Sequence, residues 1–131
     1  MSNIYIADYN NNRIRKVDVF GTISTVAGTG VGGYNGDNQA ATNAQLYHPF
    51  GVTTDTSGNV YIADNYNHRI RKVSGTTGII TTVAGFYGYN GDNIAATSAS
   101  LNYPTGVYVD GSGNIFIADY YNNRIRKVSG S

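Results

Sequence analysis

The sequence repeats itself with a period of 55 to 56 residues, and this period limits the accessible folds more than any other feature. Residues 3–17, 59–73 and 114–128 align without gaps, and each copy ends in Arg-Ile-Arg-Lys-Val. The connecting segments 33–49 and 88–104 align as well, and both begin with Gly-Tyr-Asn-Gly-Asp-Asn. A fixed period of about this size is typical of propellers, solenoids and repeat arrays.

The composition favours short strands joined by turns. Tyr, Asn, Gly and Thr are frequent, whereas the helix formers Leu and Lys are scarce and Glu is absent. Cysteine is also absent, which excludes a disulfide framework and a thiolate metal site. No apolar run approaches the roughly 18 residues of a membrane span, so we expect no membrane partner.

The middle repeat predicts an antiparallel meander of four short strands with turn residues between them. The strands are expected at 50–55, 60–64, 69–73 and 79–84. Side chains alternate along a strand, so Val60 and Ile62 face one side of the sheet and Tyr61 and Ala63 face the other. Both sides are largely apolar, which indicates a sheet covered on both faces. A propeller blade stacked between two neighbours has this property.

Three consecutive motifs of the repeat resemble a known family. Pro-x-Gly-Val-x-x-Asp, Gly-Asn-Val/Ile-Tyr/Phe-Ile-Ala-Asp and Asn-x-Arg-Ile-Arg-Lys-Val together closely resemble the NHL repeat, and the Gly-Tyr-Asn-Gly-Asp-Asn and Ala-Ala-Thr-x-Ala-x-Leu segments resemble its long bacterial form. The resemblance implies a β-propeller, usually of six blades, that serves mainly as a binding platform. The family also includes RNA binders, and related propellers include lyases and hydrolases, so the resemblance implies the fold more firmly than any activity.

The repeat divides residues 1–131 into one complete and two incomplete blades. Segment 3–28 lacks the innermost strand, segment 49–85 is complete, and segment 104–128 lacks the outermost strand. The expected fold is therefore all-β, a partial propeller of about three blades per chain that is completed by oligomerisation. Because the sequence begins and ends within a blade, we also expect the chain to be a piece of a longer repeat array or an engineered one.

Two routes could close a ring from such arcs, because propellers have about four to eight blades. In the first, two chains of three blades each form a six-bladed homodimer. In the second, the outermost strand of the first segment completes the last sheet of a neighbour, so that a homotrimer forms and residues 4–17 are displaced. We favour the homodimer, because the homotrimer gives up the pairing of two good strands.

An aspartate and an arginine recur five residues apart across the same turn of each repeat. This spacing can place a carboxylate beside a guanidinium on neighbouring strands. We predict structural salt bridges rather than catalytic acids, because a catalytic group need not recur in every blade. The predicted pairs are Asp8 with Arg13, Asp64 with Arg69, and Asp119 with Arg124.

The remaining charges do not favour nucleic acid as a partner. The second arginine and the lysine of each copy could form a basic ring around an assembled propeller. However, eight acidic residues nearly balance nine basic ones, whereas nucleic-acid-binding domains usually show a clear basic excess. We expect these side chains to extend over the blade edges instead.

Other motifs are too weak to predict a cofactor, a metal or a catalytic centre. Residues 28–33 match Gly-x-Gly-x-x-Gly, but no crossover helix follows them. Asp37 and Asp92 supply one carboxylate for each long loop, too few for calcium. His48 and His68 do not recur in the other repeats and are too few for a zinc site. We therefore expect a protein that is not an enzyme.

Tyrosine and asparagine side chains in the turns and long loops could stack on sugars or hold a peptide. The candidate ligand-binding residues are Tyr34, Asn35, Asp37, Tyr66, Tyr89, Asn90, Asp92 and Tyr120. The principal hypothesis is a self-assembling module that acts as a protein-interaction scaffold and whose main partner is a second copy of itself. Binding of a carbohydrate or another small ligand is the alternative, and RNA binding is the third.

Overall fold

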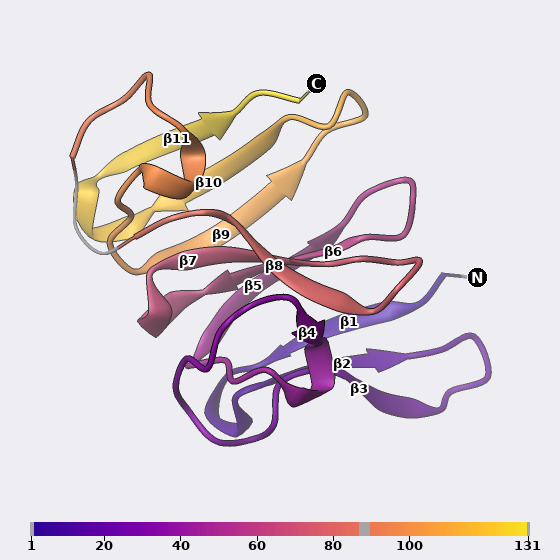
Figure 1. Cartoon of the computed structure of the whole chain (residues 1–131). Coiled ribbons are helices and arrows are strands. Elements are labelled where there is room, and N and C mark those ends of the chain that lie inside the picture. Colours follow the sequence, from indigo (N-terminus) through magenta and orange to yellow (C-terminus); the bar gives the residue numbers. More distant parts are fainter. Residues whose placement is uncertain (1, 87–89, 131) are drawn as a thin grey trace.

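The computed structural model describes residues 2–86 and 90–130. Within this part, the chain forms eleven strands and five single turns of 3-10 helix. The strands make three antiparallel sheets, here called blades 1 to 3, which are stacked in chain order (Figure 1). The all-β, blade-like architecture that the sequence predicted is confirmed.

Each blade is a meander of strands that follow one another in the sequence. Blade 1 contains β1 (Ile4–Asp8), β2 (Arg13–Val17) and β3 (Ile23–Ala27). Blade 2 contains β5 (Pro49–Thr54), β6 (Val60–Asp64), β7 (Arg69–Val73) and β8 (Ile79–Ala84), with the short β4 (Gln39–Ala40) paired to β8. Blade 3 contains β9 (Pro104–Val109), β10 (Ile115–Asp119) and β11 (Arg124–Val128). The inner strands β5 and β9 lie next to each other.

The segment that links one blade to the next contains a single turn of 3-10 helix, η2 (Ala41–Asn43) or η4 (Ala96–Ser98). The other 3-10 turns lie between two strands of one blade and are η1 (Tyr9–Asn11), η3 (Asn65–Asn67) and η5 (Tyr120–Asn122). Strand β4, immediately before η2, was not predicted. Its two residues have no strand pattern of their own, and only the free edge of β8 gives them a partner.

The turn between the second and third strand of each blade fixes the position of the next blade. Asn12, His68 and Asn123 occupy the same place in this turn, with left-handed φ values of 54°, 55° and 56°. The side chain of Asn12 accepts a hydrogen bond from the backbone N–H of His48 at 2.9 Å, and Nδ1 of His68 accepts one from the backbone N–H of Tyr103 at 3.1 Å. His68 therefore accepts the same backbone hydrogen bond as the asparagine at this position of the first repeat. Burial and the nearby charge of Arg69 lower the pKa of His68, which favours the neutral ring.

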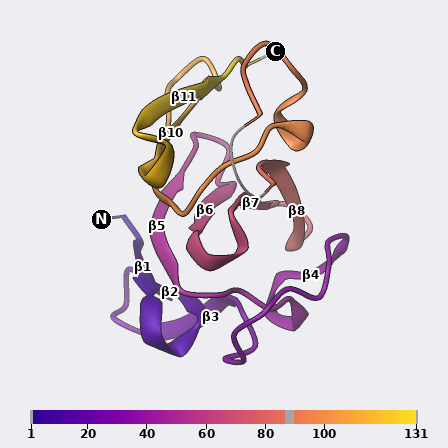
Figure 2. The ribbon, with the colours of Figure 1, turned by 90° about the vertical axis from the view of Figure 1, so that its left-hand side faces the viewer.

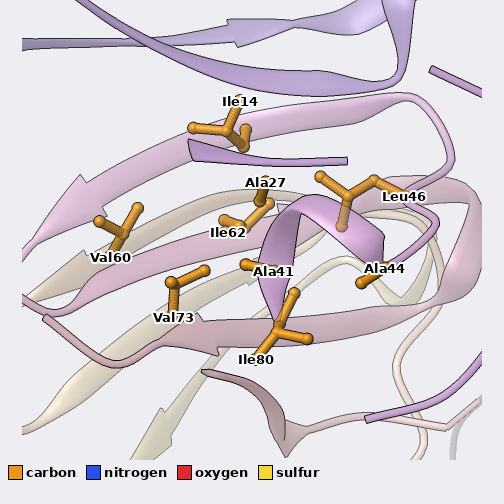
Figure 3. Close-up of a cluster of buried hydrophobic side chains, with 9 residues drawn as sticks. All are labelled: Ile14, Ala27, Ala41, Ala44, Leu46, Val60, Ile62, Val73 and Ile80. Atoms are coloured by element: carbon orange, nitrogen blue, oxygen red, sulfur yellow. The ribbon is translucent and has the colours of Figure 1, made fainter. Parts of the chain in front are cut away.

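The hydrophobic core lies between the blades rather than within a single layer (Figure 3). Val60 and Ile62 of β6 face blade 1, and Tyr61 and Ala63 face blade 3, as the alternation predicted. The linking segment adds Leu46, which is fully buried in the first core. The first core contains Ile14 and Ala27 from blade 1, Val60, Ile62, Val73 and Ile80 from blade 2, and Ala41, Ala44 and Leu46 from the linking segment.

The second core repeats the first one blade further along. It contains Tyr61, Ala63, Ile70 and Ala84 from blade 2, Val109, Ile115 and Ile117 from blade 3, and Leu101 from the second linking segment. The chain therefore builds the same inter-blade interface twice, with a buried leucine from the linking segment in each. In the described residues, no helix has the length and apolar character needed to cross a membrane.

Candidate functional site

A buried ion-pair network lies at the end of blade 2 where the long loop folds back onto the sheet. Arg71 is fully buried, and its Nη1 contacts the Asp64 carboxylate at 3.0 Å. Its Nη2 contacts the Asp37 carboxylate at 2.9 Å and donates to the carbonyl of Gly36 at 2.9 Å. The guanidinium thus ties the first linking loop to two strands of the blade.

Asp64 is itself completely buried and receives several donors. Its Oδ1 accepts the backbone N–H of Tyr47 at 2.8 Å, and its Oδ2 accepts Nδ2 of Asn67 at 2.9 Å. Burial raises the pKa of the Asp64 carboxyl, whereas the charge of Arg71 and these two hydrogen bonds oppose that rise. The carboxylate depends on Arg71 to stay charged in this environment.

In each blade the aspartate pairs with the second arginine of the Arg-Ile-Arg-Lys-Val strand, so the prediction that it pairs with the first arginine was wrong. Asp64 pairs with Arg71 and not with Arg69, although Arg69 is its direct neighbour in the strand register. Both arginines lie on the face that carries Asp64, but Arg69 directly follows the turn of the hairpin, and its Nη1 donates to the carbonyl of Asn67 at 2.9 Å. The same correction holds for Asp8, which pairs with Arg15 at 3.7 Å rather than Arg13, and for Asp119, which pairs with Arg126 at 3.3 Å rather than Arg124.

The first arginine of each strand braces a loop instead. The Arg69 guanidinium lies 4.1 Å from the ring centre of Tyr34, a cation–π contact. Nη2 of Arg13 donates to the carbonyl of Thr29 at 2.9 Å, and Nη1 of Arg124 donates to that of Asn122 at 3.2 Å. The expectation that the second arginines extend over blade edges was wrong for Arg71, which has no exposed surface, whereas Arg15 and Arg126 are 28% and 10% exposed.

The network recurs in blade 3 in nearly the same form. Arg126 contacts Asp119 at 3.3 Å and Asp92 at 2.8 Å. Asp119 accepts the backbone N–H of Asn102 and the side-chain N–H of Asn122, as Asp64 does from Tyr47 and Asn67. These repeated contacts favour a role in holding the blades together.

Most of the residues predicted to bind ligands in the long loops are engaged within the protein. Asn35 accepts the backbone N–H of Gln45 at 2.7 Å and donates to Asn43, and Asn90 accepts that of Ser100 at 2.8 Å. Tyr34 donates to Asp37 at 3.2 Å. Asp37 and Asp92 form ion pairs with Arg71 and Arg126. Tyr89 lies outside the described residues. These loop side chains stabilise the loop. Of the described residues in the predicted set, Tyr66 and Tyr120 line one surface hollow and Asp92 lines a cavity beside β11.

An aromatic arc runs across all three blades along the turns that connect their second and third strands. We use this name for Tyr9, Tyr47, His48, Tyr66, Tyr103, Tyr120 and Tyr121. The Tyr9 and His48 rings stack with their centres 4.4 Å apart, and the Tyr66 and Tyr103 rings meet edge to face at 5.3 Å. Burial and the neighbouring Tyr66 raise the pKa of Tyr9, so its hydroxyl stays protonated at neutral pH.

A hollow of about 390 Å³ opens beside the aromatic arc. Its lining is uncharged and combines aromatic rings with the amide of Asn65 and the hydroxyl of Thr105. His48 and Tyr103, which join the turns of adjacent blades, were not predicted from the sequence as part of this site. A signal was present, because an aromatic ring precedes the proline of the inner strand in both linking segments.

The described residues hold no group of three or more His, Cys, Asp or Glu side chains that could bind a metal ion. Two cavities formed by the described residues differ in character. The aromatic hollow is uncharged, whereas a larger cavity of about 730 Å³ beside β11 is lined by charged and apolar side chains.

The order of motifs, the blades and the inter-blade cores agree with one repeat family. The NHL repeat pattern matches residues 101–128, and the pattern of the teneurin NHL domain matches residues 31–90. The chain belongs to the NHL-repeat family. Human NHL repeat-containing protein 2 is 40% identical over 91 residues, which cover 64% of this chain. The chain spans 12% of the length of that relative.

Solved structures agree with the NHL fold. A protein of unknown function from Bacteroides thetaiotaomicron is 29% identical and superposes with a TM-score of 0.85, over 97% of this chain and 32% of the other. An auxiliary nutrient binding protein from the same organism is 27% identical with a TM-score of 0.76, over 96% of this chain and 34% of the other. This NHL chain therefore corresponds to about a third of each of those proteins.

Proposed function

We propose that this NHL chain is a non-enzymatic interaction scaffold that associates head to tail with copies of itself to complete a propeller ring. The observation that carries the proposal is that its two outer faces are the two halves of an interface that it already forms twice. Blade 3 presents one half and blade 1 presents the other. A heterologous contact of this kind generates a ring when its rotation closes.

The exposed residues of blade 1 occupy repeat positions that are buried in blade 2. Ile4 and Ile6 of β1 are 60% and 38% exposed, whereas Val60 and Ile62 at the same positions are 4% and 0% exposed. Ile23 of β3 is 52% exposed, although its counterpart Ile80 is fully buried. This face therefore lacks the blade that would cover it in the repeat.

Blade 3 carries the complementary half. Ile125 of β11 is 72% exposed, whereas Ile14 and Ile70 at the same position are fully buried. Covering such apolar side chains is favourable by about 25 cal/mol per Å² removed from water. Copies of the same repeat fit this surface best, because the buried counterparts already pack against their own neighbours in this way.

Light scattering after size exclusion tests the proposed self-association. We expect a mass that is a multiple of the 14.0 kDa of one chain. The simplest form of this association is the docking of two chains that each keep their three blades, here called intact arcs, and it gives twice that mass. Ile125→Asp places a charge on the outer face of blade 3 and should shift the protein to the mass of one chain. Val31→Asp, at a 60% exposed loop position, is the matched control and should leave the mass unchanged. A native chain that elutes as a folded monomer contradicts the proposal.

A second candidate function is supported by the aromatic arc and its hollow. We propose that a neutral sugar binds there, since rings with polar edges and no charge suit stacking against a pyranose. The similarity to an auxiliary nutrient binding protein supports binding of a small ligand by this fold. Tyr66→Ala removes a ring at the centre of the arc and should reduce binding on a glycan array at least tenfold. Tyr108→Ala, exposed but outside the hollow, should not. A wholly negative array contradicts this second role.

A further inference from the structure

The cavity beside β11 has the position of a fourth strand of blade 3. It is lined on one side by β11, including Ile125 and Val128, and on the other by the linking segment at Asn93, Ile94 and Ala96. In blade 2 the corresponding space is filled by β8, which pairs with β7 on one edge and with β4 on the other. The cavity of about 730 Å³ therefore lies where one further strand would pair with β11, and we call it the slot.

Backbone groups that hold β8 in blade 2 have counterparts around this slot. The N–H of Asn38 donates to the carbonyl of Ile80 at 2.8 Å, and the N–H of Ala41 donates to the carbonyl of Gly78 at 2.9 Å. Asn93 and Ala96 occupy the same places in the next repeat. A strand that enters beside β11 would meet the same pattern of donors.

Besides β8, one other strand of the chain has nearly the same sequence as the strand that fills the corresponding space in blade 2. Residues 22–28 differ from residues 79–85 only at the first and third of seven positions, and they form β3. Within one chain, β3 cannot reach the slot, because β3 and β11 lie on opposite sides of blade 2 in both views (Figures 1 and 2). The matching occupant is β3 of a second copy.

We infer that β3 is exchanged between copies, so that β3 of one chain completes blade 3 of the next by pairing with β11. This inference rests on the proposed self-association, and it replaces docking of the intact blade 1 face by exchange of β3. Each copy then contributes two complete four-stranded blades, and three copies supply the six blades of a ring. Strands β1 and β2 leave their places, because β10 and β11 of the neighbour occupy them.

Exchange preserves the linking segment at the junction between copies. Strand β3 leads directly into the segment that carries Ala41, Ala44 and Leu46, all of which are buried in the first core. After exchange this segment lies between the completed blade and blade 2, as it does within one chain, and Ile125 takes the place of Ile14. A junction made by docking intact arcs has no such segment in the described residues.

The strands that exchange releases have a weaker ion-pair network than their counterparts in blades 2 and 3. Asp8 and Arg15 of blade 1 form one ion pair at 3.7 Å, whereas Arg71 and Arg126 each contact two carboxylates. Ile4 and Ile6 are also largely exposed. Exchange replaces this hairpin with its better-anchored counterpart from blade 3 and buries Ile125, which offsets the loss of pairing between β1 and β2.

Engineered disulfides distinguish exchange from docking, because the native chain has no cysteine. Lys16 faces Ser24 in the β2–β3 pair, and Lys72 faces Thr81 in the equivalent β7–β8 pair. The same register places Lys127 of one copy opposite Ser24 of another. On mild oxidation, the variant with S24C and K127C should give disulfide-linked chains up to the trimer on a denaturing gel. The variant with K16C and S24C should stay uncrosslinked in the oligomer.

The variant with K72C and T81C is the matched control, since its disulfide forms inside blade 2 in either arrangement and reports correct folding. An oligomer in which K16C and S24C form a bond within one chain, and S24C and K127C form none, overturns exchange while self-association stands. A monomer of the native chain overturns both. Native mass gives a second readout: three times 14.0 kDa supports exchange, and twice that mass contradicts it.

A chain that fills its own slot provides an independent check. Replacing residues 129–131 with the sequence of residues 74–85 supplies a fourth strand to blade 3 from the same chain. This extension should abolish the bond between S24C and K127C and the trimeric mass. Persistence of the bond in the extended chain would show that β3 does not enter the slot beside β11.

Discussion

Replacing Arg71 by methionine is expected to lower the free energy of unfolding by about 3–5 kcal/mol, the usual cost of leaving one member of a buried ion pair without its partner. The guanidinium is fully buried and neutralises the Asp64 carboxylate, which has no exposed surface. Without Arg71, this carboxylate is left as an uncompensated buried charge or must take up a proton. Urea denaturation at a fixed protein concentration measures the loss.

Arg15→Met is the matched control for this prediction. Arg15 is the repeat equivalent of Arg71, but its side chain is 28% exposed and its contact with Asp8 is 3.7 Å long. Exposed ion pairs of this kind contribute about 0–1 kcal/mol. Similar losses for the two variants would contradict the assignment of Arg71 as the central cation of the network.

Neutralising the carboxylate should recover part of the stability. In the Arg71→Met background, Asp64→Asn keeps the acceptor for the Tyr47 N–H and removes the buried charge. The double variant is therefore expected to unfold at a higher urea concentration than Arg71→Met alone. No recovery would mean that Arg71 acts mainly through Asp37 and the loop carbonyl of Gly36.

The fold could be predicted from the sequence because its determinants are local and repeated. The alternation along β6 correctly assigned Val60 and Tyr61 to opposite faces of the blade. The strands could be placed because a turn pattern lies between each pair and the pattern recurs in the next copy. The short strand β4 could not, since only its pairing with β8 makes it a strand.

The ion-pair network could be predicted only in part, because its geometry is not local. Spacing along the chain brought Asp64 opposite Arg69, but the ion pair runs diagonally to Arg71, two residues further along the same face. The contact between Arg71 and Asp37 spans 34 residues, and no spacing rule reaches that far. The recurrence of Asp37 and Asp92 in both long loops was the available signal, and a structural role explains it better than a calcium ligand does.

The aromatic arc was missed for a related reason. His48 was set aside because it does not recur as histidine, yet what its position keeps is an aromatic ring, which is Tyr103 in the next repeat. Both residues have a left-handed φ of 50° and sit between the turns of two blades. Their role depends on the stacking of blades, which local sequence does not encode.

Leu46→Ala is expected to destabilise the protein by about 2–5 kcal/mol, the usual range for removing a fully buried leucine without collapse of the cavity. Leu46 has no exposed surface and fills the first core from the linking segment. Leu101→Ala is the matched control, because Leu101 fills the same place in the second core and is 1% exposed. Denaturant titrations of the two variants should give comparable losses of overall stability.

The two leucine variants should differ in their assembly on dilution. If β3 is exchanged, Leu46 lies at the junction between two copies, whereas Leu101 lies between blades of one chain. Leu46→Ala should then weaken association and release single chains at concentrations where Leu101→Ala still forms the ring. Docking of intact arcs places both leucines inside one chain and predicts equal dissociation. Light scattering over a dilution series therefore shows where the first inter-blade core is formed, within one chain or between two.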